Sequence, residues 1–455
     1  RLWPLRHARL HALRRRQLLK LAGAATAGGL GLGSLAHLSA SAQSVGDYKA
    51  LVCLFMYGGN DGNNLLVPLE LPAYDGYRRA RTNLALDRDA LLPIAPTNTS
   101  GARYGLHPAM AGLQGLFTQG KAAMLANIGS LAVPTSKAQW EARSVPLPDN
   151  LFSHSDQQAQ WQSAIVDAPP RSGWGGRMIE RLIAAEAANR GYGLVSVAGG
   201  NLWENGDRSL AAYKVSSAGR FGFDFYDASG GDPLSAAISD TLSEPRSHLL
   251  EQAWTDVVSR SIDNQRILTQ ALSGSELTTV FPGTGLGQQL QMIARLISAR
   301  SRLGLSRQCF FCSIGGFDTH GDDQLQRQTE LLGEISTAVT AFYEATVALG
   351  VQNDVALFTA SDFGRTFQSN GQGSDHAWGS HHFVVGGAVK GGQIVGRYPE
   401  LIVNGPDDAG DGKWIPTTSV DQLGATLGRW FGAAASLNDV FPRLSNFDAD
   451  LGFMT

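Results

Sequence analysis

Cysteine is scarce in this sequence, with three residues among 455. An odd and small number argues against a framework of disulfides. Cys309 and Cys312 have the spacing of a redox or metal-binding pair. However, they lie in an apolar run typical of a strand, where residues three apart face opposite sides of a sheet. We therefore interpret them, together with Cys53, as small buried hydrophobic residues.

Positive charge is scarce after residue 42. Residues 1–42 contain six Arg, one Lys and no acidic residue, which leaves 30 basic residues against 40 acidic ones in the rest of the chain. The rest therefore carries a net charge of about −10. Nucleic-acid binding needs basic patches that face the phosphates, so the composition predicts no nucleic-acid partner.

No apolar run of about 20 residues follows residue 42, which predicts that this part does not insert stably into a membrane. Residues 21–38 do form an apolar stretch, but five glycines dilute it. Arg15, Arg16 and Lys20 precede the stretch, and the small residues of a cleavage site follow it at 40–42. This arrangement resembles a twin-arginine signal.

We therefore predict a twin-arginine signal peptide over residues 1–42, which the twin-arginine translocase binds during export. The remaining protein, residues 43–455, is predicted to be periplasmic or secreted. The alternative is an uncleaved anchor helix. The twin-arginine route carries folded proteins, often with a metal or cofactor already bound, so this signal also hints at a cofactor.

The order of apolar and amphipathic segments predicts an α/β fold with parallel strands. Ala50–Tyr57 and Gln308–Ile314 are continuous apolar runs of strand length, as in buried parallel strands. Between 332 and 349, apolar residues recur at spacings of three and four, which predicts an amphipathic helix before a strand at Asp354–Thr359. This is a βαβ unit. No linker is evident, so we predict one domain with a helical insertion at about 230–300.

Acidic residues follow three of the predicted strands directly. Asp61, Asp318 and Asp362 each have a glycine within two residues, and ligands of open α/β sheets bind outside the carboxyl ends of the strands. Of the seven histidines after residue 42, four fall within 63 residues: His320, His376, His381 and His382. The clustering indicates a functional site, although for any single acid a capping or turn role is an equal alternative.

Carboxylates and neutral imidazoles together suit Zn²⁺ or Mn²⁺, and two such ions could clamp a phosphate or sulfate. Asp375 and His376 are further candidate ligands. His381 and His382 are adjacent, so at most one is expected to point inward, and we favour His381. Arg365 could hold an oxyanion in bidentate fashion. Ca²⁺ is a further option, but the acidic loop 407–412 lacks EF-hand spacing and is expected to be an exposed hairpin loop.

Ser153 and His154 precede a short polar helix and are the candidate catalytic residues from outside the cluster. A nucleophile at a helix N-terminus would have its charge stabilised by the helix dipole. The alternative for Ser153 is a plain N-cap, which the polar first turn favours.

The motifs YGGNDGNN, FDTH, SDFGR and SDHAWGSHHFVVGGAVKGGQIVG, with the leader, resemble those of the domain-of-unknown-function-1501 family. That family is itself similar to the alkaline phosphatase and sulfatase superfamily. The resemblance implies a three-layer α/β/α sandwich with a mostly parallel sheet and metals at the strand ends. It also implies matches to the superfamily's metal ligands for Asp61, Asp318, His320, Asp362, and His376 or His381.

Two departures from the superfamily pattern leave two hypotheses. Phe363 stands where the superfamily places a metal-binding His, and the nucleophile has no clear counterpart, Ser153 being matched by position only. The first hypothesis is an exported metal-dependent hydrolase of small phosphate or sulfate esters, with Asp375 or His376 replacing the missing ligand. The second is a catalytically silent binding or assembly protein on the same scaffold, with a periplasmic protein as its partner.

Overall fold

The computed structural model describes residues 47–455 except 189–190, 209, 219–225 and 228–230. The predicted signal peptide therefore lies outside the described residues. Within the part that is described, no helix has the length and apolar character needed to cross a membrane.

A nine-stranded sheet runs through the centre of the protein. Its order is β11-β5-β10-β9-β1-β8-β6-β7, with β12 paired to β5. Every pairing is parallel except those of β10, which runs antiparallel to both of its neighbours. The strands are β1 (Lys49–Tyr57), β5 (Ala122–Gly129), β6 (Leu194–Ser196), β7 (Tyr213–Lys214), β8 (Arg307–Gly315), β9 (Val355–Ser361), β10 (Ser380–Gly386), β11 (Ile394–Val395) and β12 (Thr418–Ser419).

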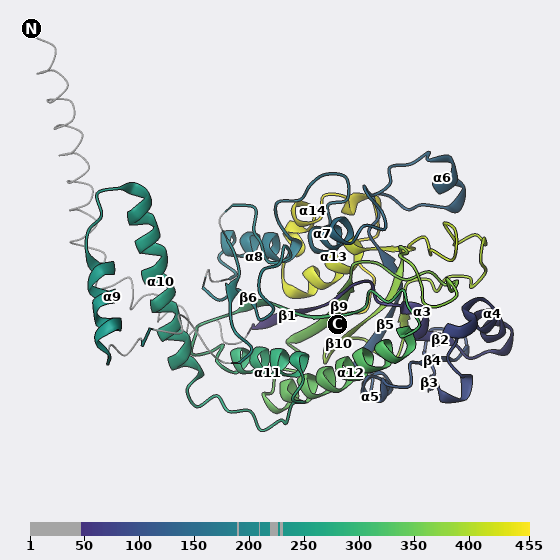
Figure 1. The fold of residues 1–455 in the computed structure, drawn as a ribbon, viewed down its shortest axis with the longest axis horizontal. Helices are drawn as coiled ribbons and strands as arrows, with labels where there is room; N and C mark the ends of the chain where they lie inside the picture. Colours follow the sequence, from purple (N-terminus) through teal and green to yellow (C-terminus); the bar gives the residue numbers. More distant parts are fainter. Residues whose placement is uncertain (1–46, 189–190, 209, 219–225, 228–230) are drawn as a thin grey trace, which may run out of the picture.

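Helices cover both faces of this sheet, as Figure 1 shows. The alternate residues Val52 and Leu54 of β1 belong to one apolar core, and Cys53 and Phe55 belong to another, as expected when successive side chains of a strand point to opposite faces. The predicted three-layer α/β/α sandwich with a mostly parallel sheet is confirmed. One layer contains α5 (Ala111–Thr118), α11 (Gly285–Ser298) and α12 (Gln324–Ala348), and the other contains α8 (Trp174–Ala184), α13 (Val420–Phe431) and α14 (Leu437–Val440).

The predicted βαβ unit is present as β8, α12 and β9, and both strands pair with β1. The cysteines are free and buried as expected, with Cys309 in one core and Cys312 in the other. Small elements flank the sheet near the end of β1: α3 (Gly62–Leu65), α4 (Leu71–Arg81) and a second sheet of β2 (Leu66–Pro68), β3 (Leu92–Ile94) and β4 (Tyr104–Leu106).

The helical segment expected between 230 and 300 divides into parts with different roles. The sequence predicts one helix over 236–272, but α9 (Pro233–Ser243) and α10 (Leu249–Leu272) are separate. Pro245 explains the break, because a proline disfavours the helical conformation in the residue before it. The α9–α10 pair projects from the body of the molecule, whereas α11 covers the sheet (Figure 1).

Glu204 is a fully buried acid in the loop that follows β6, and one of its oxygens accepts a hydrogen bond from Asn201 Nδ2 at 2.7 Å. Burial raises the pKa of Glu204 from 4.5 to about 8. The folded protein therefore keeps the proton at a pH where the unfolded chain has lost it, so stability falls as the pH rises from about 4.5 to about 8.

We expect Glu204→Gln, which mimics the neutral acid, to stabilise the protein by about 2–3 kcal/mol at pH 7. Urea unfolding at pH 4.5 and pH 7 would measure this, with little difference between the two proteins at the lower pH. A variant that is less stable than the parent at pH 7 would contradict the prediction.

Candidate metal centre

Three loops at the carboxyl edge of the sheet meet the first turn of α7 (His154–Ser163). The loop after β1 is tight, because Gly58 has a φ of 113° and a Cβ atom there would lie 2.4 Å from the backbone nitrogen of Asp318. Only glycine accepts that conformation without strain. Gly58 also donates its backbone N–H to Asp362 Oδ2 at 3.2 Å, so the loops after β1, β8 and β9 are held together.

Arg365 is the hub of these loops. Its guanidinium is fully buried and donates to the backbone oxygens of Gly58, Gly59, Phe317 and Ser374, and to the carboxylate of Asp318. Nη1, which donates to the backbone oxygen of Ser374, also lies 3.2 Å from His320 Nε2. The bidentate grip on a substrate oxyanion expected from the sequence is therefore corrected. The guanidinium of Arg365 is occupied within the protein and positions the loops.

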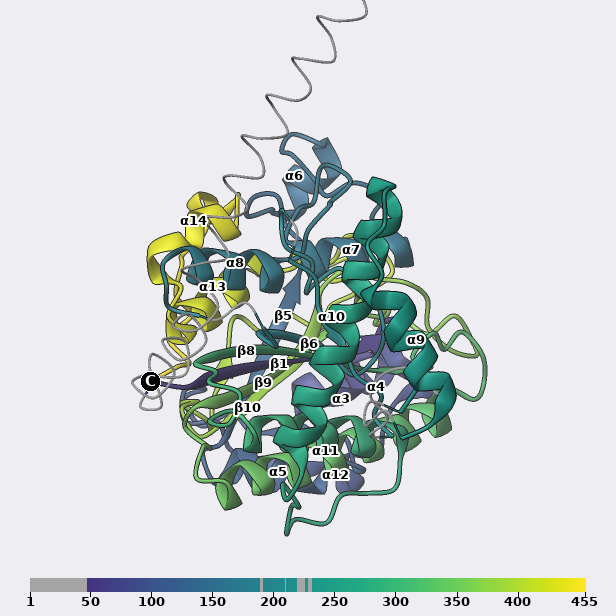
Figure 2. The same ribbon diagram turned by 90° about the vertical axis from the view of Figure 1, so that its left-hand side faces the viewer.

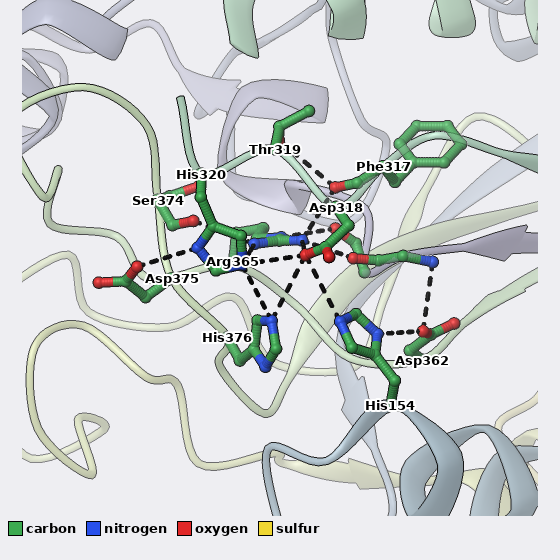
Figure 3. A network of polar contacts seen from close by, with 12 residues as sticks. His154, Phe317, Asp318, Thr319, His320, Asp362, Arg365, Ser374, Asp375 and His376 are labelled. Atoms are coloured by element: carbon green, nitrogen blue, oxygen red, sulfur yellow. Dashed lines mark hydrogen bonds and ion pairs between the residues drawn. The ribbon is translucent and has the colours of Figure 1, made fainter. Parts of the chain in front are cut away.

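Three histidines approach Asp318 from different segments, as Figure 3 shows. The Nδ1 atom of His154 lies 2.6 Å from Asp362 Oδ2, that of His320 lies 3.1 Å from Asp375 Oδ1, and that of His376 lies 2.8 Å from the backbone oxygen of Phe152. All three partners are oxygen acceptors, so each Nδ1 carries the proton. In this tautomer each Nε2 carries the lone pair that a metal would bind, and the one on His320 also faces Arg365 Nη1 at 3.2 Å.

The Nε2 atoms converge on one carboxylate oxygen. Asp318 Oδ1 lies 3.0 Å from the Nε2 of His320 and 3.4 Å from the Nε2 atoms of His154 and His376. The Nε2 atoms of His320 and His376 are 3.1 Å apart. Ligands bound tetrahedrally to Zn²⁺ at 2.0–2.2 Å lie roughly 3.4 Å from one another, so these spacings fit such an ion.

The residues present thus suit a metal ion. His154, Asp318 and His376 each offer a ligand atom within 4.8 Å of the others, and His320 is a fourth candidate. The Nε2 atom of His154 is buried and makes no hydrogen bond within the described residues, so it is available as a metal ligand.

The electrostatics favour the cation-binding forms of Asp318 and His376. Partial burial by itself raises the pKa of Asp318, but the hydrogen bond and charge of Arg365, with His154 and His320, outweigh this effect and lower the pKa to about 2. Burial lowers the pKa of His376, and the nearby cationic groups lower it further. An ionised carboxylate and a neutral imidazole are the protonation states that ligate metals.

Asp375 has an orienting position. Its side chain is about half exposed, and it accepts from His320 Nδ1 and from Asn370 Nδ2 at 3.1 Å. Carboxylates that hold the outer nitrogen of a ligating histidine fix the orientation and tautomer of the ring.

We expect Asp375→Asn to weaken metal binding by about 10- to 100-fold while the free energy of unfolding of the metal-free protein stays within about 0.5 kcal/mol. Titration with Zn²⁺ against a competing chelator would measure the affinity. An unchanged affinity would remove His320 from the ligand set.

Phe363 forms the apolar floor of the cluster. Its ring is fully buried and lies 4.7 Å from the ring of His154 and 4.6 Å from that of His376, measured between centroids. A Cβ on Gly59 would come within 2.5 Å of this ring. The position that the resemblance assigns to a metal-binding His is thus filled by a phenyl ring that packs against His154 and His376.

Asp61 has another set of partners. Its carboxylate is 2% exposed, forms an ion pair with Arg81, accepts from Gln324 Nε2 at 2.7 Å, and caps α3 through the backbone N–H of Asn63. Both carboxylate oxygens are engaged, Oδ2 by Arg81 and Gln324 and Oδ1 by Asn63, and the group is buried, so no oxygen of Asp61 is left for a metal. The ligand role predicted for Asp61 is therefore corrected to a structural one.

His381 and His382 both lie inside the protein, on β10, and the expectation that only one points inward is wrong. Both faces of the central sheet are covered, so neighbouring residues of one strand are both buried. His381 Nδ1 accepts from the backbone N–H of Asn127 at 3.1 Å, and its ring stacks on Tyr398. Burial lowers the pKa of each histidine to about 3. His381 therefore belongs to the core, and the ligand role expected for it is corrected.

Ser153 is the N-cap residue of α7, but its hydroxyl donates to Asp156 Oδ2 at 2.6 Å and makes no capping bond to the backbone. Its neighbour His154 joins the cluster as a candidate ligand, and no local pattern could have shown this, because its partner Asp362 lies 208 residues further along the chain. The contact of the Phe152 backbone oxygen with His376 Nδ1 could likewise not be predicted from the sequence. Asp407 and Asp408, in the acidic loop, are held by Arg397 and by backbone N–H groups.

The fold and the cluster define a class, namely an α/β/α sandwich protein with a His/Asp centre at the carboxyl ends of its strands. Residues 48–426 match the family of proteins of unknown function DUF1501, so the chain belongs to this family and the family prediction is confirmed. No curated protein matches the sequence.

Two solved structures illustrate what the chain is similar to. One is the lipoteichoic acid synthase LtaP from Listeria monocytogenes, at 8% identity over 79% of this chain and 70% of that one, with a TM-score of 0.29. The other is the sulfatase PsFucS1 from Pseudoalteromonas sp., at 9% identity over 91% and 72% of the two chains, with a TM-score of 0.32.

Proposed function

We propose that the protein is an exported, metal-dependent hydrolase of phosphate or sulfate esters. The observation that supports this is the convergence of three Nε2 atoms on one carboxylate at the edge of the sheet where ligands of α/β proteins bind. Imidazole suits Zn²⁺, and then Mn²⁺, better than Ca²⁺, which prefers oxygen ligands. The proposal of export rests on the leader at residues 1–42.

In this proposal His154, Asp318 and His376 hold one ion and leave a coordination position open, as in catalytic zinc sites. The bound ion would polarise an ester oxygen and lower the pKa of a coordinated water. Asp362 and the backbone oxygen of Phe152 keep two of the rings in place. His320 lies at the exposed rim as the fourth candidate ligand, and with its proton on Nδ1 the lone pair of its Nε2 can bind the ion or accept a proton from the coordinated water.

Water is the proposed nucleophile. The hydroxyl of Ser153 donates a hydrogen bond to the carboxylate of Asp156, and its other polar contact is with Ser155. Neither contact is a base that belongs to the cluster. A bound ion would supply a more acidic water, so no side-chain nucleophile would be needed, which agrees with the absence of a clear counterpart to the superfamily's nucleophile.

The test compares protein stripped by a chelator with the same protein reloaded with Zn²⁺ or Mn²⁺. p-Nitrophenyl phosphate, p-nitrophenyl sulfate and bis(p-nitrophenyl) phosphate serve as substrates. We expect hydrolysis of at least one ester to disappear on stripping and return on reloading. No turnover by protein with a bound metal would refute the proposal.

The second candidate, a catalytically silent binding or assembly protein, is supported by Phe363, which fills the place of a metal-binding residue. In that case the metal would hold the loops in shape and the partner would be a periplasmic protein. The two candidates differ in turnover by the metal-loaded protein and in recovery of a defined partner from the periplasm.

A further inference from the structure

The α9–α10 hairpin carries an apolar surface that no described part of the chain covers. Leu250, Trp254 and Val257 of α10 are 72%, 65% and 53% exposed, and Leu234 of α9 is 54% exposed. A groove of about 620 Å³ lies between the helices and is lined mainly by apolar side chains, among them Ile238, Leu242, Trp254, Val257 and Val258. Contiguous exposed apolar surface of this kind marks an interaction site.

The hairpin is anchored at one end and free at the other. Leu268, Ala271 and Leu272, near the end of α10, belong to the core beneath the sheet, and Tyr192 Oη donates to the backbone oxygen of Asn264 at 2.7 Å. The earlier turns of α10 stand beside α9 in both views (Figures 1 and 2), and Figure 1 shows them away from the sheet. The apolar residues of these turns are therefore presented to a partner rather than to the core.

We infer that this surface is the interface between two copies of the chain, whose hairpins pack into a four-helix bundle. Leu250, Trp254 and Val257 of α10, followed by the polar Ser261, have the 4-3-4 spacing of a short coiled-coil seam. A two-helix hairpin with such a seam buries it fully when it meets a second hairpin across a two-fold axis.

The charges beside the seam argue against a membrane as the occupant. Residues 233–272 contain five acids and three arginines, and Arg246 and Arg266 already pair with Glu244 and Asp263 of the same hairpin. An anionic membrane surface would require an excess of basic residues.

The free part of the hairpin sets the size of the interface. The turns of α10 before Asn264, which Tyr192 holds, are about 22 Å long, α9 is about 16 Å long, and neighbouring helices lie about 9 Å apart. Together they offer roughly 350 Å² in projection, so two copies would bury about 700 Å² before the interlocking of side chains is counted. This is the size of a weak interface whose formation depends on concentration.

The metal centre lies at the carboxyl ends of the strands, the side on which α3 follows β1. Figure 1 shows the hairpin on the opposite side of the sheet, so it is remote from the metal centre. Pairing would leave the centre of each copy open. The inference is therefore independent of the proposed hydrolysis.

Sedimentation of the purified protein between 1 and 100 μM tests the inference. We expect a concentration-dependent dimer, and Leu250→Asp with Trp254→Asp to weaken the self-association by about 30-fold or more with an unchanged circular dichroism spectrum. Val280→Asp is the matched control, because Val280 is 87% exposed outside the hairpin. A protein that stays monomeric at 100 μM, or a dimer that persists in the double variant, would overturn the inference.

Cross-linking tests the geometry without a disruptive variant. The native cysteines are buried, so single cysteines introduced for Leu250, Val257 or Ser261 would be the reactive thiols among the described residues. Near a two-fold axis, at least one of these positions should form a disulfide-linked dimer under mild oxidation, whereas Val280→Cys should not. Failure at all three positions would place any dimer contact elsewhere and overturn the inference.

Discussion

Replacing His376 with alanine is expected to release the metal and abolish metal-dependent hydrolysis while the protein remains folded. The Nε2 atom of His376 lies 3.1 Å from that of His320 and 3.4 Å from Asp318 Oδ1, so its removal takes away one corner of the ligand set. Because mutation of groups that only orient ligands costs 10- to 100-fold in affinity, loss of a ligand should cost more than about 100-fold.

Metal content after dialysis, measured by mass spectrometry, is the primary readout, and ester hydrolysis is the second. His248→Asn is the control, because His248 caps α10 through Leu250 N, and asparagine is also a good N-cap residue. A His376→Ala protein with the metal content of the parent would remove His376 from the centre, whatever its activity.

Asp61→Ala is expected to destabilise the metal-free protein by about 3–5 kcal/mol, because it leaves the guanidinium of Arg81 buried and without its carboxylate. Gln324, which donates to the same carboxylate, also loses a partner. Urea unfolding of both proteins in chelator measures this difference without any contribution from bound metal.

The comparison separates the structural role of Asp61 from a ligand role. Asp75→Ala, at an exposed position of α4, should change stability by less than about 0.5 kcal/mol. An Asp61→Ala protein that is as stable as the parent but no longer binds metal would restore Asp61 to the ligand set.

The sheet was predictable because its central strands are continuous apolar runs. β1 is buried on both faces, so seven consecutive residues from Ala50 to Met56 had to be apolar or small. The direction of β10 was not predictable, because an apolar run reads the same for a parallel and an antiparallel strand. The same burial on two faces explains why His381 and His382 are both inside.

The place of the candidate centre was predictable because acids follow the strands there, as at Asp318 and Asp362, but Asp362 faces His154 Nδ1 and is not in the group that could hold the ion. It was not predictable where identity depends on a distant partner. The sequence around Asp61 is the same whether its carboxylate binds a metal or pairs with Arg81. Only the packing of α4, which brings Arg81 to Asp61, shows that the ion pair forms. Asp362 orients the ring of His154 through the contact with Nδ1. The two residues come together only when α7 packs over the end of β9.

The pairing of β1 has a consequence for the order of folding. Lys49 pairs with Arg307, and Ala50 with Val355, so the first strand to be synthesised waits for strands made much later. Contacts so distant along the chain make folding slow and leave apolar strand edges exposed in the meantime. A nascent chain that stops before Val355 lacks β9 and the loop with Asp362 and Arg365. It therefore has no hub for the centre, and the metal would enter as one of the last events of folding.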